Sequence, residues 1–272
     1  PAKRQAFRAE LTAATKLAPP GVYADRVRMM SEVLGYTEAF CEMIEKRNAH
    51  DWVGAGQALT ALGQFRDVLT KYETELVTKK YALQYLSRFF LNTTTQGVER
   101  ATTKGKVVVG LADEWDFQLD PGKTGEAQQF FSVDLSGGNW GKLRTSSLSW
   151  SDQGLRHFKG DGWYRQWLEV PASAKDQQVF LWFGAVDEKA TVWVNGMPLG
   201  DSPGKAFQPF EMDATKVIKP GERNLVVARV RNDTLNEVGT GGICGPVMFW
   251  TPGPKPHVAE TGGEDVTLVE FK

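Results

Sequence analysis

The sequence predicts an α+β protein in which a helical bundle comes first and an all-β sandwich follows. Through about residue 91, apolar side chains recur at steps of three and four, the period of an amphipathic helix. From Lys106 the pattern changes to alternation and to short apolar runs, which are typical of strands. Eight of the 9 tryptophans follow residue 100. This split indicates two parts with different tasks.

Composition limits the classes of partner. The 272 residues are 41% hydrophobic and 24% charged, as in a globular protein. The formal net charge of -1 provides no basic field, so we expect no nucleic acid and no membrane as partner. No apolar run is long enough to span a bilayer. The three histidines and two cysteines are scattered, so no metal site is expected.

The first hundred residues predict several helices. Amphipathic periodicity covers residues 24–46 and returns over residues 51–76. Residues 48–51 form a turn whose last member, Asp51, can cap the second helix, and so short a connection makes the two helices antiparallel neighbours. A shorter helix before them ends at two prolines, residues 19–20. A last helix is expected to carry Tyr81, Tyr85, Leu86, Phe89 and Phe90.

Charged side chains in this region lie between the apolar positions, which is typical of a solvated outer face. We expect the bundle to be a spacer or a platform for another domain. Residues 92–105 are polar, rich in threonine and punctuated by glycine, so the domain boundary is placed there. The predicted parts are a helical bundle at 1–98, a linker at 99–106, a β-sandwich at 107–252 and a tail at 253–272 with an edge strand at 266–271.

The strands of the second part are joined by tight turns. Residues 163–170 alternate, which places Trp163 and Arg165 on one face of a strand. Residues 178–186 are almost wholly apolar, as in a central strand buried on both faces. Asn195-Gly196 is a strong hairpin signal, because both central turn positions need positive φ. Strands at this spacing, without long helices between them, predict a sandwich.

Several short motifs follow one another in a fixed order along this part. They are Gly162-Trp163-Tyr164-Arg165, Val170-Pro171, Phe183-Gly184-Ala185-Val186-Asp187, Ala190-Thr191-Val192-Trp193-Val194-Asn195-Gly196, Phe207 with Pro209-Phe210, Asp213-Ala214-Thr215, and Gly241-Gly242-Ile243 before Gly245-Pro246-Val247. Their order resembles the sugar-binding β-sandwich domain of glycoside hydrolase family 2, the β-galactosidase and β-glucuronidase group. The resemblance implies a galactose-binding-like jelly roll over about residues 107–252.

The resemblance also bears on catalysis. In that family the catalytic acids lie in a barrel after the sandwich, and no such barrel fits after Trp250, so no catalytic residue is expected here. We expect a segment of a larger polypeptide: a non-catalytic carbohydrate-binding or accessory region of a polysaccharide-degrading enzyme, extracellular or periplasmic, whose partners are a carbohydrate or polysaccharide and the missing catalytic domain. The alternatives are a structural interaction module that braces a catalytic domain, and a stand-alone carbohydrate-active enzyme.

A sugar exposes C–H patches on one face and hydroxyls at its rim, so its site combines an aromatic ring with amides, carboxylates or an arginine. The candidate sugar-binding residues are Trp140, Arg156, His157, Asp161, Trp163, Asn232 and Asp233. Trp182 and Trp193 lie in apolar strands and are expected in the core. Arg165 is expected to form an ion pair with Asp187. No cofactor is expected; a structural calcium ion, common in such sandwiches, leaves no readable ligand spacing here.

Overall fold

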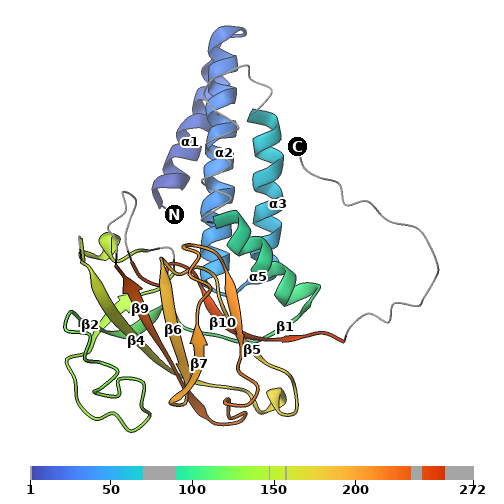
Figure 1. The fold of residues 1–272 in the computed structure, drawn as a ribbon. Coiled ribbons are helices and arrows are strands. Elements are labelled where there is room, and N and C mark those ends of the chain that lie inside the picture. The colour runs from blue at the N-terminus through green and yellow to red at the C-terminus, as the bar shows by residue number, and fades with distance from the viewer. Residues whose placement is uncertain (1, 70–89, 147, 157, 234–240, 255–272) are drawn as a thin grey trace.

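The computed structural model describes residues 2–69, 90–146, 148–156, 158–233 and 241–254. Helices precede two antiparallel sheets that pack face to face (Figure 1). The described helices are α1 (Ala2–Leu17), α2 (Val22–Asn48), α3 (Trp52–Leu69) and α5 (Asn92–Thr102). None of the helices in these ranges is long and apolar enough to cross a bilayer. The predicted order, helices first and a β-sandwich second, is confirmed.

Ten strands form the two layers. The four-stranded sheet has the order β1 (Gly105–Gly110), β10 (Val247–Pro252), β5 (Phe180–Phe183), β8 (Phe210–Asp213). The six-stranded sheet has the order β3 (Gly141–Arg144), β2 (Glu114–Asp120), β4 (Gly160–Glu169), β9 (Arg223–Asn232), β6 (Lys189–Val194), β7 (Met197–Asp201). Every pairing is antiparallel, as the turn-rich sequence predicted.

The alternation along β4 sorts side chains between the two faces of the six-stranded sheet. Tyr164 points into the core between the sheets, and Trp163 lies in a separate cluster on the outer face. Inside the core, the indole N–H of Trp150 donates to the Tyr164 hydroxyl at 2.6 Å. Burial raises the pKa of Tyr164, so its hydroxyl stays neutral.

The hairpin between β6 and β7 turns at Asn195 and Gly196, with φ of 53° and 79°. Both values lie in the left-handed region that the two-residue turn requires, so this prediction is confirmed. The Asn195 amide also donates to the carbonyl oxygen of Val217 and to the side-chain oxygen of Asn224, at 2.8 and 2.7 Å. The turn is therefore tied to the loop before β9.

Helices α2 and α3 pack side by side, as the short connection between them predicted. The cap prediction is also confirmed: the Asp51 carboxylate accepts the Gly54 N–H at 2.9 Å. A Cβ at Gly35 would lie 2.4 Å from the Phe65 ring, so glycine allows this close approach. Residues 70–76 of the predicted second helix lie outside the described residues. The same holds for Tyr81, Tyr85, Leu86 and Phe89, and for the predicted edge strand at 266–271.

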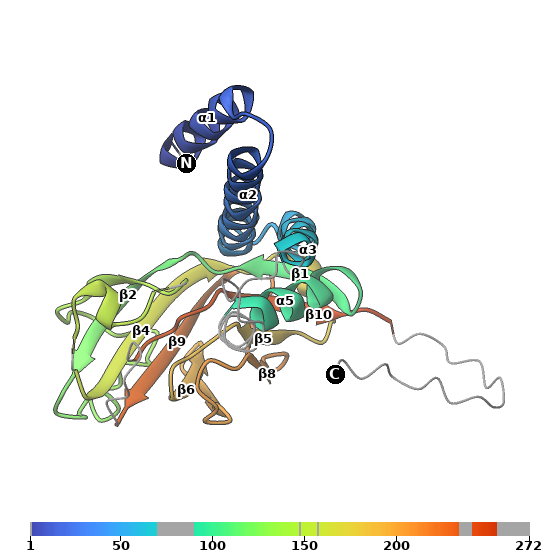
Figure 2. The ribbon, with the colours of Figure 1, turned by 90° about the horizontal axis from the view of Figure 1, so that it is seen from above.

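Residues 92–102, expected as part of a polar connection, instead form α5, which lies along the outer face of the four-stranded sheet (Figure 2). The threonines have a structural reason: the buried Thr93 hydroxyl donates to the Gly184 carbonyl oxygen at 2.8 Å. The predicted linker at 99–106 accordingly holds the last turn of α5 and the start of β1. The division of the chain into domains stays a prediction.

A tryptophan cluster joins the helices to the sandwich. Trp52 of α3 packs edge-on against Trp182 of β5, with ring centroids 5.7 Å apart. The guanidinium of Arg100 in α5 lies over the rings of Trp182 and Trp250, and its Nε donates to Glu211 at 2.9 Å. Trp182 is buried, as expected, but in this interface rather than between the sheets.

Gly97 of α5 lies directly beneath Trp52, and a Cβ there would come within 2.1 Å of the indole. Replacing Gly97 by alanine is expected to lower the free energy of unfolding by about 1 kcal/mol, because overpacking outweighs the gain in helix propensity. Gly63→Ala, at a helical site with open space, is the matched control and should raise the same quantity by up to about 1 kcal/mol. Urea denaturation measures both, and equal effects would contradict this account of the interface.

Candidate functional site

The outer face of the six-stranded sheet is partly covered by the segment between β2 and β3. Phe130 from this segment packs edge-on against Trp163, and Phe131 stacks on Trp193, with centroid distances of 5.7 and 5.4 Å. Trp163 and Trp193 stack on each other at 5.3 Å. Trp163 is 0% exposed, so it belongs to a second, smaller core and offers no ring to a sugar.

Asp120, the last residue of β2, anchors this covering segment. Its carboxylate accepts the backbone N–H groups of Thr124 and Gly125 at 2.8 and 2.7 Å, and the Trp163 indole N–H at 3.0 Å. Burial disfavours the ionised carboxylate, but these donors outweigh burial and hold the pKa of Asp120 below its usual value. The ionised carboxylate of Asp120 thus holds the covering segment against the sheet through hydrogen bonds.

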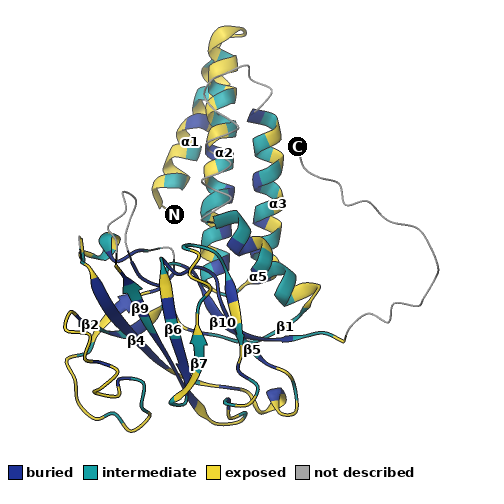
Figure 3. Cartoon of the chain, viewed as in Figure 1, coloured by how far each residue is buried: buried dark blue, intermediate teal, exposed yellow. Residues whose placement is uncertain are grey.

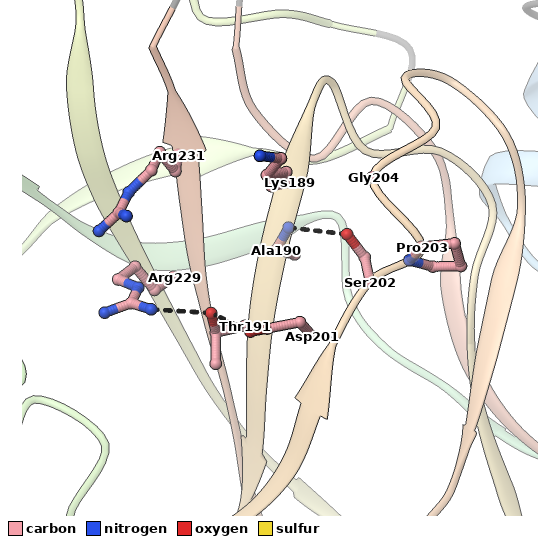
Figure 4. A pocket seen from close by; sticks show the side chains of 9 residues that line it. All are labelled: Lys189, Ala190, Thr191, Asp201, Ser202, Pro203, Gly204, Arg229 and Arg231. Carbon is pink, nitrogen blue, oxygen red and sulfur yellow. Dashed lines mark hydrogen bonds between the residues drawn. The ribbon is translucent and has the colours of Figure 1, made fainter.

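Beside the covered part, the same outer face opens into a polar pocket of about 360 Å³ (Figure 4). Strands β6 and β9 form its floor, and the chain after β7 forms one wall. The residues that line it are Lys189, Ala190, Thr191, Asp201, Ser202, Pro203, Gly204, Arg229 and Arg231. The pocket therefore offers cationic donors on β6 and β9 and hydroxyl and carboxylate groups nearby.

Buried groups hold the two arginines in place. Asp161 accepts from Nε and Nη2 of Arg231 at 2.7 and 2.9 Å, a bidentate pair, and lies 3.9 Å from Nε of Arg229. The hydrogen bond to Asp161 raises the pKa of Arg231. The Arg229 guanidinium lies 5.7 Å from the ring centres of both Trp163 and Trp193. Two residues predicted to touch sugar, Asp161 and Trp163, instead orient the arginines that line the pocket.

The other predicted site residues lie apart from this pocket. Trp140 is half-buried and has the Arg165 guanidinium over its ring, 5.4 Å from the centre. Arg156 is exposed on the loop before β4, and His157 lies outside the described residues. Asn232 is buried and its amide donates to the Phe158 carbonyl oxygen at 3.4 Å. Asp233 is exposed.

The ion pair expected between Arg165 and Asp187 is not formed. Arg165 donates to two backbone carbonyl oxygens of the covering segment, those of Phe130 and Ser132. The Asp187 carboxylate accepts the Gly241 N–H at 2.6 Å. The alternation along β4 places Arg165 on the outer face of the six-stranded sheet, beside Trp163. Asp187 lies beyond the end of β5 and is bonded to the glycine-rich loop, so the two side chains do not meet.

Sequence reasoning missed Arg229, Arg231 and Lys189. The available signal was the spacing in Val-Ala-Arg-Val-Arg-Asn, since two arginines two residues apart on a strand share one face. The sequence left open whether Trp167 lies in the core or on the surface; it is the tryptophan with the largest exposed fraction, 39%, with Arg223 over its ring at 5.1 Å. Of all nine tryptophans, which the structure describes, Trp140 and Trp167 alone escape full burial.

The pocket combines cationic side chains with a single carboxylate among its described lining residues. A glycosidase needs two carboxylates across the sugar, whereas Asp201 is the one carboxylate among the described lining residues, and it accepts the Thr191 hydroxyl at 2.7 Å. In the part of the chain that the structure describes, no three histidine, cysteine or acidic side chains gather as a metal site requires. Several lining groups already bond to one another or to neighbours: Arg229 donates to Glu126 and Thr191, and the Ser202 hydroxyl accepts the Ala190 N–H at 2.9 Å.

The two sheets define a sandwich of the jelly-roll type, and a comparison with known families agrees. Residues 144–239 match the model described as "Glycosyl hydrolases family 2, sugar binding domain". This range contains β4 to β9 and every residue that lines the pocket. The resemblance to that family's sugar-binding domain, inferred from the motif order, is confirmed for the sandwich.

Two curated relatives carry the same kind of name. A β-glucuronidase of Paenibacillus borealis is 33% identical over 131 residues, which are 48% of this chain and 22% of that protein. A β-galactosidase of Thermoanaerobacter pseudethanolicus is 38% identical over 69 residues, 25% of this chain and 9% of that protein. The aligned part of the chain thus spans under a quarter of the length of either relative.

Among solved structures, the apo β-glucuronidase of Ruminococcus gnavus aligns with a TM-score of 0.46 and 22% sequence identity. The alignment covers 53% of this chain and 29% of that one.

Replacing Asp120 by asparagine is expected to lower the free energy of unfolding by about 1–3 kcal/mol at neutral pH, because charge-assisted bonds to the covering segment are lost. Since the folded-state pKa lies below the unfolded one, the wild-type advantage is complete above about pH 4 and disappears as pH falls through the folded value. Asp134→Asn, an exposed change in the same segment, is the control. An advantage that persists at low pH would refute the assignment to a charge.

Replacing Asp161 by asparagine should cost about 2 kcal/mol of unfolding free energy, less than for a fully buried pair because Arg231 keeps some contact with water. Urea denaturation at neutral pH measures the loss. Asp176→Asn, on an exposed turn, is expected to leave stability within about 0.5 kcal/mol of wild type. If both variants unfold alike, Asp161 does not hold the two arginines.

Proposed function

We propose that this chain is a non-catalytic carbohydrate-binding or accessory region of a larger polysaccharide-degrading enzyme. The observation that carries the proposal is the polar pocket on the outer face of the six-stranded sheet, within the range that matches a sugar-binding model. Its guanidinium, ammonium, hydroxyl and carboxylate groups can bond to sugar hydroxyls as donors and acceptors. The exposed Trp167 adds an aromatic surface at another part of the same sheet.

The parent enzyme would supply the catalytic carboxylates. The names of the curated relatives, β-glucuronidase and β-galactosidase, support a parent that cleaves β-glycosides. The short share of those relatives that aligns supports a role as one part of such an enzyme rather than the whole. An extracellular or periplasmic location is part of this proposal, and fractionation of the source cells would test it.

One observation favours a second candidate, a module that braces a catalytic domain without binding sugar. Most of the tryptophans are buried in the two clusters of the sandwich or in the helix interface. Buried rings stabilise a fold but bind no ligand. The two candidates differ in whether the pocket side chains contribute to affinity for any saccharide.

Affinity electrophoresis of the purified chain in gels that contain soluble polysaccharides separates the candidates. If the pocket binds sugar, a retarding polysaccharide will be found and Lys189→Ala will weaken its affinity about tenfold or more, the loss of roughly one hydrogen bond to a charged group. Lys189 is exposed and lines the pocket, whereas Lys175 is exposed elsewhere. Lys175→Ala is therefore the matched control and should migrate like the wild type.

Two results would count against the proposal. Retardation by no polysaccharide in a broad panel would leave the bracing role as the better account. Retardation that Lys189→Ala and Trp167→Ala both leave unchanged would exclude the pocket and the exposed ring as the binding surface. Release of reducing ends by the chain alone would instead show an enzyme in its own right.

A further inference from the structure

The helical hairpin of α1 and α2 carries most of the exposed large apolar side chains of the described residues. Six of the ten large apolar side chains that are exposed among the described residues belong to these two helices: Phe7, Leu17, Val22, Tyr23, Met30 and Val33. Three of them, Phe7, Met30 and Val33, gather at one groove, and an exposed apolar patch of this kind marks an interaction surface in a folded protein. The hairpin extends away from the sandwich, so none of the described strands covers it (Figure 2).

Helix α1 has little to hold it in place. Of its 16 residues, Leu11 alone is buried (Figure 3). It packs on α2 in the antiparallel sense, fixed by ion pairs from Arg4 to Glu45 and from Arg8 to Glu38. A helix of this length is marginal in water and draws its stability from packing. The hairpin as described therefore lacks a neighbour on its other side.

An open apolar groove of about 350 Å³ runs along the seam of the hairpin. Phe7 enters it from α1, and Met30 and Val33 enter it from α2. Each of these three side chains is about 40% exposed, so half of each remains free to contact another molecule. The groove is large enough to receive an aromatic side chain such as a second Phe7.

Charge indicates what covers the groove. Lys3, Phe7 and Glu10 follow one another at steps of four and three, so they lie in one stripe on α1. Neither Lys3 nor Glu10 forms an ion pair with a described residue. The two charges are placed symmetrically about Phe7. A two-fold axis at Phe7 therefore brings Lys3 of one α1 opposite Glu10 of an antiparallel second α1, and forms the pair twice.

We propose that the occupant is a second copy of this chain, which docks its α1–α2 hairpin on the first as a two-fold, antiparallel four-helix bundle. Area supports a weak dimer. Helix α1 is about 24 Å long and the hairpin about 20 Å wide, so each copy buries on the order of 500 Å². The total of about 1,000 Å² is near the lower limit for a specific interface, so the dimer is reversible and forms in the micromolar range.

Sedimentation velocity of the 272-residue chain, over about two decades of concentration around the micromolar range, tests the proposal. The wild type is expected to pass from monomer to dimer. Val33→Glu places a charge in the groove and should abolish the dimer in this range. Val53→Glu makes the same change at a more exposed valine of α3 and should leave the dimer unaffected. Circular dichroism confirms that each variant keeps its helices.

Exchanging the charges of Lys3 and Glu10 tests whether the two α1 helices are antiparallel in the dimer. Lys3→Glu and Glu10→Lys each turn two attractions into repulsions and should each weaken the dimer about tenfold. The double variant Lys3→Glu/Glu10→Lys restores opposite charges and should return the dissociation constant to within about threefold of wild type. Added salt should reduce these differences.

Three results overturn the proposal: a wild type that stays monomeric, equal effects of Val33→Glu and Val53→Glu, or a double variant no better than the single ones. A monomer would mean that something other than a copy of this chain covers the hairpin.

Discussion

The structure depends on the pairing of β4 with β9. These two strands are matched over ten residue pairs, from Gly160 with Asn232 to Glu169 with Arg223. One face of this ladder supplies Tyr164, Val226 and Ala228 to the core between the sheets. Because side chains alternate, the other face carries the ionic and aromatic groups that make the pocket and the second core. A shift of one residue would exchange the two sets.

The outer face of this ladder shows how a buried charge can fix the side chains that line a pocket. Asp161 would be costly to bury alone, but it is bonded to Arg231 and lies near Arg229. The ring of Trp163 packs against the Arg229 guanidinium, and its indole N–H donates to Asp120. The same side chains thus hold the covering segment and fix the direction of the arginines, so the stability and the geometry of the pocket have a common origin.

Sequence reasoning predicted local features well, because periodicity and turn chemistry are local. The Asn195-Gly196 hairpin, the Asp51 cap and the alternation along β4 follow from them. It could not predict that α5 packs on the sheet, because a threonine-rich sequence suggests exposure to solvent. Threonine can be buried when its hydroxyl finds an acceptor, and here the acceptor is the carbonyl oxygen of Gly184, which is distant in sequence.

The site was predicted less well, for a related reason. Trp163 was a sensible sugar contact by residue type, but Phe130, which packs against it, comes from a segment about 30 residues earlier without regular structure. Arg229 and Arg231 are read as surface charges until their partner on the neighbouring strand is known. Side-chain type indicates what a residue can do; the packing between distant segments decides whether it is accessible.

The edge strands of the sandwich determine whether two molecules could aggregate by pairing their sheets edge to edge. Helix α5 lies on one sheet and the β2–β3 segment covers part of the other, whereas each edge strand pairs on one side only among the described strands. In the six-stranded sheet these edge strands are β3, only four residues long, and β7, which contains Pro198 and has a register shift beside it. A short strand, and one that lacks an N–H and bends, are poor templates for addition of another strand. These two edges of the six-stranded sheet therefore resist the edge-to-edge aggregation to which open sheets are prone.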